Sequence, residues 1–329
     1  MADAIVVRGV TKTFGPKVAV RDLDLTVAAG ALTGFIGPNG AGKTTTIRMI
    51  MSILFPDQGE VSVLGHRSAL DAKDRIGYLP EERGVYKKMK VLSFLRYIAR
   101  LKGVASQGLD AGIKQWLERM DLGDVAGKKC EELSKGMQQK LQFIACVLHQ
   151  PDLLILDEPF SGLDPVNMRL LRDLIVEQHK RGATIIFSTH VMIQAEQLCE
   201  RVVMIDEGIK VLDESMGAIR AKFDPRVVLL EPLDAAAPVE DLRALPGIRG
   251  VERTGETWRL SLTESSDPPT VIRDIVNAVP PARIELHRPS LEDIFIQIVT
   301  AAKGGASREG KALRAALSAQ GQSAGEVQA

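Results

Sequence analysis

Residues 37–44 read Gly-Pro-Asn-Gly-Ala-Gly-Lys-Thr and match the phosphate-binding pattern G-x-x-x-x-G-K-[ST] at every fixed position. Because glycine lacks a Cβ, such a turn can fold back and point successive backbone N–H groups at an anion. Lys43 is expected to reach the β- and γ-phosphates of a triphosphate, and Thr44 to ligate Mg²⁺. A chance glycine-rich turn is the alternative, which the strand-like residues before it and the helix-like residues after it disfavour. The expected nucleotide contacts are Gly37, Pro38, Asn39, Gly40, Ala41, Gly42, Lys43, Thr44 and Thr45.

Two carboxylates, Asp157 and Glu158, end the apolar run at residues 153–156. In open α/β sheets, ligands bind beyond the carboxyl ends of the strands. Asp157 therefore suits a hold on Mg²⁺, and Glu158 suits the orientation and deprotonation of an attacking water. Two acids after a strand can also be a solvated turn, but the phosphate loop in the same chain favours the catalytic interpretation.

A second anion-binding helix end is predicted at Ser134, which is a good N-cap for the helix expected over residues 135–149. One phosphate loop does not require two such helix ends in one chain. Taken alone, this segment fits an ordinary capped helix with no ligand.

Together these segments resemble an ABC-type ATPase, the nucleotide-binding subunit of an ATP-binding-cassette transporter, over about residues 4–222. Residues 133–140, Leu-Ser-Lys-Gly-Met-Gln-Gln-Lys, resemble the L-S-G-G-Q signature of that family. In the family, the signature of one subunit closes over the ATP held by another. The resemblance therefore implies that Ser134 and Gly136 contact ATP in a homodimer or in a dimer with a paralogous ATPase.

The resemblance also assigns further roles. His190 resembles the switch histidine that contacts the γ-phosphate and acts with Lys43 and Glu158, and Phe14 resembles the aromatic that stacks on adenine. Glu81 stands where the family has a glutamine and is expected still to ligate Mg²⁺. Lys135 replaces a glycine of the signature and Met137 replaces its glutamine, while Ser134 and Gly136 remain, so an intact contact to the γ-phosphate is expected.

The elements that position these residues follow from periodicity. Residues 4–10, 17–27 and 58–64 alternate or are strand-rich and predict an antiparallel subdomain. Residues 31–54 predict a buried strand, the loop and a helix whose apolar face carries Ile47, Ile50, Met51 and Leu54. Residues 88–150 change to a helical period, with Leu92, Leu95, Ala99 and Leu101 expected on one helix face. Residues 153–190 predict a strand–helix–strand crossover of a parallel sheet.

The predicted fold class is therefore α/β: a P-loop ABC-ATPase core with an antiparallel β subdomain and a helical insert, followed by a small α+β domain. In that second domain the order β-α-β-β-α-β resembles a ferredoxin-like split, with a different mixed sheet as the alternative. The predicted domains are residues 1–222 and 226–302. Residues 303–329 are rich in Ala, Gly, Ser and Gln and are expected to be a disordered tail.

Composition limits the kinds of partner and the cellular compartment expected for the chain. Of the 329 residues, Lys+Arg and Asp+Glu number 42 each, so the formal net charge of zero argues against a nucleic-acid surface. Cys130, Cys146 and Cys199 form no metal or disulfide pattern and are expected to be buried thiols in a reducing cytoplasm. No secretory signal and no run of about 18 apolar residues is found, so the chain is not expected to span a membrane by itself. The family resemblance implies a cytoplasmic position, peripheral on the inner face of the cell membrane.

The stretch at residues 76–103 and the segment at 290–299 resemble the subfamily that serves ABC-2 export-type permeases, including sodium-extrusion and drug-resistance systems. This implies export of a solute through a separate membrane permease, with Val85, Tyr86 and Met89 as candidates for the permease-facing groove. The alternative is a soluble ABC ATPase that acts on ribosomes or DNA, although the chain has one cassette and no heptad array.

Overall fold

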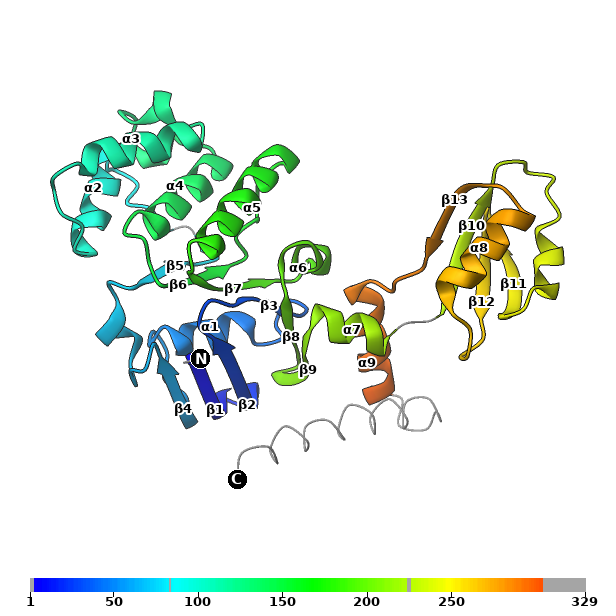
Figure 1. Ribbon diagram of the computed structural model, residues 1–329. Coiled ribbons are helices and arrows are strands. Elements are labelled where there is room, and N and C mark those ends of the chain that lie inside the picture. Colours follow the sequence, from blue (N-terminus) through cyan, green and yellow to red (C-terminus); the bar gives the residue numbers. More distant parts are fainter. Residues whose placement is uncertain (1–2, 83, 224–225, 304–329) are drawn as a thin grey trace. The chain divides into compact units, whose positions relative to one another are not determined.

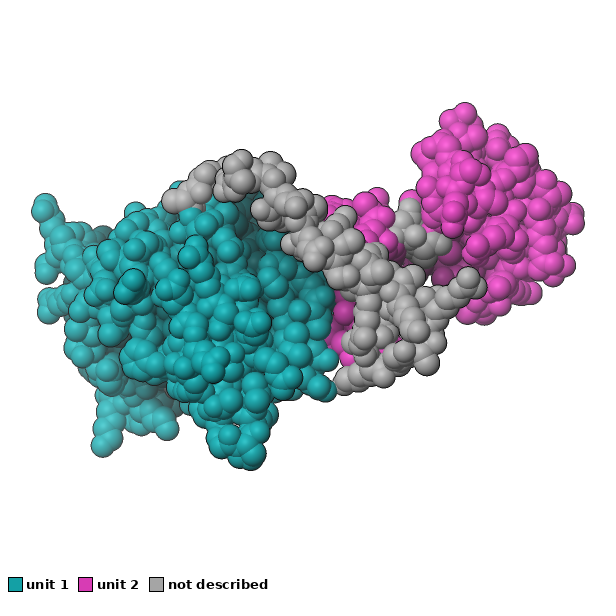
Figure 2. Space-filling view, turned by 90° about the horizontal axis from the view of Figure 1, so that it is seen from below, with its two compact units in different colours: residues 1–216 teal, residues 217–329 magenta. Residues whose placement is uncertain are grey.

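The computed structural model describes residues 3–82, 84–223 and 226–303, and the chain divides into two compact units, residues 1–216 and 217–329 (Figure 2). Each unit has a hydrophobic core of its own. The predicted tail at residues 304–329 lies outside the described residues.

The first unit begins with a three-stranded antiparallel sheet in the order β2-β1-β4 (Figure 1). Its apolar side chains alternate along β2, where Val20, Leu23, Leu25 and Val27 are at most 1% exposed, as the sequence pattern predicts. The bounds are β1 Asp3–Phe14, β2 Lys17–Ala28 and β4 Gln58–Val63.

A six-stranded sheet in the order β5-β6-β7-β3-β8-β9 carries the site. All neighbours are parallel except β9, which forms a hairpin with β8. Every residue of β3 and β6 is buried, because elements cover the sheet on both faces. The bounds are β3 Leu32–Ile36, β5 Ile76–Leu79, β6 Leu153–Asp157, β7 Thr184–Thr189, β8 Arg201–Asp206 and β9 Ile209–Ser215.

The helices of this unit mostly follow the predicted periods. The helix after the phosphate loop is shorter than expected, since it ends at Ile50 and leaves Met51 and Leu54 beyond it. Leu101, expected on a buried face, is 58% exposed at the end of its helix. The bounds are α1 Lys43–Ile50, α2 Val91–Leu101, α3 Leu109–Arg119, α4 Lys135–Val147, α5 Pro165–Lys180, α6 Met192–Leu198 and, at the junction of the units, α7 Met216–Lys222.

The second unit contains a four-stranded antiparallel sheet in the order β11-β12-β10-β13. Because β12 lies between β10 and β11, the element order forms the split predicted from the sequence. The segment predicted as its first helix is a 3₁₀-helix, Val239–Ala244. The other bounds are β10 Val227–Pro232, β11 Ile248–Thr254, β12 Thr257–Leu262, α8 Pro268–Ala278, β13 Pro281–Leu286 and α9 Leu291–Lys303.

The three cysteines are free and buried, as expected. Among the described residues, no helix is long and apolar enough to cross a membrane. Within that same part of the chain, no cluster of His, Cys, Asp and Glu has the arrangement of a metal site made of those residues alone.

Candidate functional site: a phosphate loop beside two strand-end carboxylates

The phosphate loop runs from the end of β3 to the start of α1. Gly42 immediately precedes the helix with φ +106°, and a Cβ on it would lie 2.5 Å from the carbonyl oxygen of Ala19. A side chain at position 42 would therefore be both strained and blocked by backbone. Thr46 Oγ1 donates a 2.9 Å hydrogen bond to the Gly42 carbonyl and ties the loop to the first turn of α1.

The turn between β8 and β9 supports the loop from outside. The Gly208 N–H donates to the carbonyl oxygen of Ala41 at 2.9 Å, and the Arg21 N–H of β2 donates to the carbonyl oxygen of Gly208 at 2.9 Å. The sequence predicts this turn only as a connection between strands. In the structure it joins the phosphate loop to the antiparallel sheet.

Lys43 lies folded against its own loop. Its Nζ donates to the carbonyl oxygens of Gly37 at 2.8 Å and Pro38 at 3.1 Å, and lies 4.0 Å from Glu158 Oε1. Burial lowers the pKa of Lys43, while the charge of Glu158 opposes that shift. The ammonium is thus held by two carbonyl oxygens of its own loop, with the Glu158 carboxylate nearby, at the place where phosphate would enter.

Asp157 ends β6 and is fully buried. Its Oδ1 accepts a hydrogen bond from Ser188 of β7, whereas its Oδ2 has no hydrogen-bond partner among the described residues. Burial raises the pKa of Asp157, and the bond from Ser188 opposes the shift. The Asp157 carboxylate lies near the Thr44 side chain. A buried carboxylate of this kind beside a hydroxyl fits a hard cation such as Mg²⁺, which takes oxygen ligands.

Glu158 follows with the left-handed φ of +49°, which turns the chain sharply at the strand end. Its Oε1 accepts from the backbone N–H of His190 at 3.0 Å and from His190 Nδ1 at 2.8 Å. Its Oε2 lies 3.4 Å from Thr189 Oγ1. The structure thus brings Lys43, Glu158 and His190 together, although they come from three elements far apart in the chain.

A pocket of about 320 Å³ opens beside these residues. It includes Phe14, which is 50% exposed at the end of β1, and the exposed Glu81. Lys17 and Ala19 also line it and were not predicted; their signal was the start of the strand directly after Phe14. The remaining lining residues are Asn39, Gly40, Gly42, Lys43, Thr44, Thr45 and Glu158. The predicted contacts Gly37, Pro38 and Ala41 lie in the loop but not in the pocket lining.

Ser134 and Gly136 are not among the residues that line this pocket. Ser134 is the exposed N-cap of α4, and its Oγ accepts a 3.3 Å hydrogen bond from the Met137 N–H. A Cβ on Gly136 would lie 3.5 Å from the carbonyl oxygen of Gly162. Ser134 therefore caps α4 as predicted, and Gly136 lies close to the loop that follows the carboxylates. Neither residue lines the nucleotide pocket formed by the same chain.

Two side-chain hydrogen bonds connect α4 to that loop and to the first turn of α5. Gln139 Nε2 donates to the Pro159 carbonyl oxygen at 2.9 Å, and Lys140 Nζ donates to Asn167 Oδ1 at 3.0 Å. The segment following Glu158 is therefore anchored to the helix that Ser134 begins.

Comparison with known proteins agrees with this geometry. Residues 20–161 match the family model described as ABC transporter, and residues 215–299 match that of the ATP-binding protein DrrA1-3-like, C-terminal domain. An uncharacterized ABC transporter ATP-binding protein, YhaQ, of Bacillus subtilis is 42% identical over 89% of this chain and 97% of its own length. The Nod factor export ATP-binding protein I of Burkholderia lata is 34% identical over 88% of this chain and 95% of its own.

A third relative, the daunorubicin resistance ATP-binding protein DrrA3 of Streptomyces coeruleorubidus, is 33% identical over 91% of this chain and 96% of its own. A solved structure of an ATP-binding subunit of an ABC transporter superposes with a TM-score of 0.62 at 29% identity, covering 67% of this chain and 93% of that one. Fold, site and relatives together define an ATP-binding cassette that binds and hydrolyses ATP. The chain belongs to the ABC transporter family, among its ATP-binding subunits.

Proposed function

We propose that this chain hydrolyses ATP as one half of a dimer that closes over two ATP molecules and drives export of a solute through a separate membrane permease. The observation that carries the proposal is the division of the site within one chain. The pocket supplies the phosphate loop, Glu81 and Glu158, whereas Ser134 begins a capped helix outside it. A second chain placed head to tail would bring that helix end to the open side of the nucleotide.

Within the pocket, Phe14 would stack on the adenine, and residues 37–45 would bind the phosphates. Thr44, Asp157 and Glu81 would hold Mg²⁺, which neutralises charge on the phosphates when it is bound. Lys43 would turn from the Gly37 and Pro38 carbonyl oxygens to the β- and γ-phosphates. Glu158 would orient and deprotonate the water once His190 turns from its carboxylate to the γ-phosphate.

The export assignment rests on relatives, since two of them are named for Nod factor export and for daunorubicin resistance. An exposed apolar cluster supports a permease partner. Tyr86 is 51% exposed and its ring lies edge-on to Tyr97 at 5.5 Å, and Leu101 follows one helical turn later on α2. Val85 and Met89 border Tyr86 and are partly buried. A cytoplasmic helix of a permease at the inner face of the membrane is the proposed occupant.

The test uses Glu158→Gln, which removes the base but keeps the shape of the side chain. With Mg-ATP this variant is expected to sediment as a dimer, and its kcat is expected to decrease by a factor of about 10² to 10⁴. The wild type in Mg-ADP, sedimenting as a monomer, is the control. A variant that stays monomeric and hydrolyses ATP at the wild-type rate contradicts the proposal.

The partner is tested separately by purifying the tagged chain from its own cells in mild detergent. Recovery of a multispanning membrane protein is expected. Recovery of ribosomes or DNA instead would favour the soluble ABC ATPase and contradict the transporter assignment. The variant Tyr86→Asp, at an exposed position, is expected to lose the membrane protein while keeping ATP binding.

A further inference from the structure

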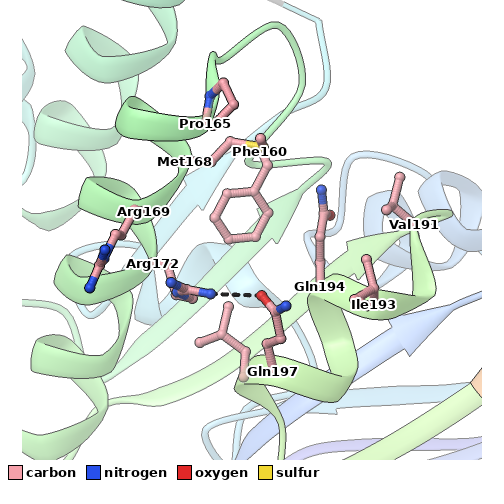
Figure 3. A pocket seen from close by; sticks show the side chains of 10 residues that line it. Phe160, Pro165, Met168, Arg169, Arg172, Val191, Ile193, Gln194 and Gln197 are labelled. Atoms are coloured by element: carbon pink, nitrogen blue, oxygen red, sulfur yellow. Dashed lines mark hydrogen bonds between the residues drawn. The ribbon is translucent and has the colours of Figure 1, made fainter. Parts of the chain in front are cut away.

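A second pocket, of about 340 Å³, lies on the cassette between α5 and α6 and shares no lining residue with the nucleotide pocket (Figure 3). Phe160, Met168, Ile193 and Leu198 contribute apolar surface to its lining. Its volume and mainly apolar lining are those of small-molecule pockets, which hold a few polar groups at defined places.

Two arginines of α5 give this pocket its charge. Arg172 donates a 2.6 Å hydrogen bond to Gln197 Oε1, which is the oxygen of a neutral amide. Arg169 makes no hydrogen bond or ion pair with any residue that the structure describes. No carboxylate belongs to the pocket lining. An occupant that complements these walls therefore has an apolar body and one negative group, to which a guanidinium can donate a charge-assisted pair.

The pocket also touches the segments that carry the catalytic side chains. Phe160 lies two residues after Glu158, and Val191, which lines the pocket, directly follows His190. Gln194 of the lining accepts a 2.7 Å hydrogen bond from Thr189 Oγ1, whose oxygen is also 3.4 Å from Glu158 Oε2. An occupant would thus contact both of the strand-end segments that carry Glu158 and His190.

We propose that the pocket between α5 and α6 is a regulatory site for a small amphipathic carboxylate, such as a medium-chain alkyl carboxylate. The carboxylate binds Arg169 and Arg172, and the alkyl chain lies on Phe160. Binding fixes α6 against α5 and lowers the rate of hydrolysis without displacing ATP. The regulatory effect rests on the proposed catalytic roles of Glu158 and His190, whereas the binding itself does not.

The binding test is calorimetric titration of the full-length chain, without nucleotide, with decanoate kept below the concentration at which it forms micelles. Saturable binding at one site is expected. The double variant Arg169→Gln/Arg172→Gln should weaken Kd by about tenfold or more, because it removes both charged donors. Ile193→Asp, at an exposed position, should abolish binding by placing a negative charge in the pocket.

Two comparisons make the outcome decisive. The double variant Arg249→Gln/Arg259→Gln removes two positive charges from the second unit and should bind decanoate as the wild type does. Decanol, which has the same alkyl chain without the charge, should bind about tenfold more weakly or worse. Absence of saturable binding, equal weakening by both double variants, or equal binding of decanol would overturn the proposal.

The regulatory effect is measured on the same samples. Saturating decanoate should decrease kcat for ATP, while the Kd for ATP stays within about twofold. Arg169→Gln/Arg172→Gln should hydrolyse ATP like the wild type and lose the response to decanoate. If decanoate binds but leaves kcat unchanged, the regulatory role is wrong. If the Glu158→Gln test fails while decanoate still binds, the fault lies in the catalytic assignment and not in the pocket.

Discussion

Asp157 depends on one neighbour that the sequence pattern did not mark, Ser188. The hydroxyl of Ser188 donates to Asp157 Oδ1, while Asp157 Oδ2 has no hydrogen-bond partner within the described part of the chain. An outer partner of this kind fixes the orientation of a metal-binding carboxylate. The order Ser188, Thr189 and His190 at the end of β7 thus supplies a contact to each of the two strand-end carboxylates.

Replacing Ser188 by Ala should raise the Mg²⁺ concentration needed for half-maximal hydrolysis by about 10- to 100-fold, because Asp157 loses the bond that orients it. Steady-state rates at varied Mg²⁺ and constant ATP measure this. Thr33→Val is the control. Thr33 lies in β3 of the same sheet, and its buried hydroxyl has no hydrogen-bond partner among the residues that the structure describes. An unchanged Mg²⁺ requirement in Ser188→Ala would show that Asp157 needs no such support.

His149 predicts how stability depends on pH. Its Nε2 donates to the Ile76 carbonyl oxygen at 3.2 Å, while its Nδ1 is buried without a partner among the described residues. Burial, reinforced by the charge of Lys102, lowers the pKa of His149 to about 4. In the unfolded chain the imidazole takes up a proton near pH 6.5, whereas in the folded chain it does so only near pH 4. The contribution of neutral His149 to the free energy of unfolding is therefore complete above pH 6.5 and is lost as the pH falls to about 4.

The expected loss between pH 6.5 and 4 is at most roughly 3 kcal/mol in the free energy of unfolding, at about 1.4 kcal/mol per pKa unit. Urea unfolding at several pH values measures it. His149→Gln, which keeps a donor for Ile76, should flatten the dependence over this range. His66→Gln changes an exposed histidine and should leave it as in the wild type. Equal slopes for the two variants would contradict the assignment.

At the scale of elements, the phosphate loop requires glycine at position 42 because there is no space for a Cβ and because φ is left-handed there. Gly42→Ala should lower the free energy of unfolding by several kcal/mol and abolish ATP binding, because its Cβ would lie 2.5 Å from the Ala19 carbonyl oxygen. Gly30→Ala is the matched control, since Gly30 has φ +76° with nothing within 4 Å of its Cβ. Gly30→Ala should lower the free energy of unfolding by only about 1 to 2 kcal/mol, for the left-handed backbone. Urea unfolding measures the stability of the two variants, and nucleotide titration measures their affinity for ATP.

The sequence predicted the elements whose patterns are strong. The alternation of β2 and the apolar run of β6 both lie where predicted, since burial on one face or two leaves a readable pattern. Strand β5 was missed because it is four residues long and contains Gly77, which packs against the Cys146 carbonyl oxygen. The 3₁₀-helix Val239–Ala244 shares its apolar spacing with one turn of α-helix, so periodicity could not separate them.

The candidate site also divides into residues that the sequence predicted and residues that it did not. The residues within one motif, such as Lys43 and Thr44, were predicted from local spacing, because their chemistry is local. The contacts from Lys17, Ala19 and Ser188 arise where distant strands meet, and no spacing in the chain records that meeting. The same holds for the turn at Gly208, whose role appears only when β8 and β2 stand beside the loop.

At the scale of the whole molecule, a shared site predicts complementation between two inactive variants. Lys43→Ala removes the phosphate contact, and Ser134→Arg blocks the capped helix end. In an equal mixture, half of the dimers contain one of each variant, and one of their two sites has both wild-type parts. Hydrolysis should therefore recover to about a quarter of the wild-type rate. Mixing Lys43→Ala with Glu158→Gln should recover nothing, because both changes lie in the same half of a site. Failure of the first mixture to recover would contradict a shared site.

The bond between Gly208 and Ala41 has a consequence for the order of events in folding. Because this hydrogen bond joins residues far apart in the sequence, we expect the phosphate loop to take its final shape only once β8 and β9 have packed beside it. A nucleotide finds no binding site until that closure has occurred. ATP should therefore lengthen the lifetime of the native cassette by slowing its unfolding, while the rate at which the chain folds stays the same.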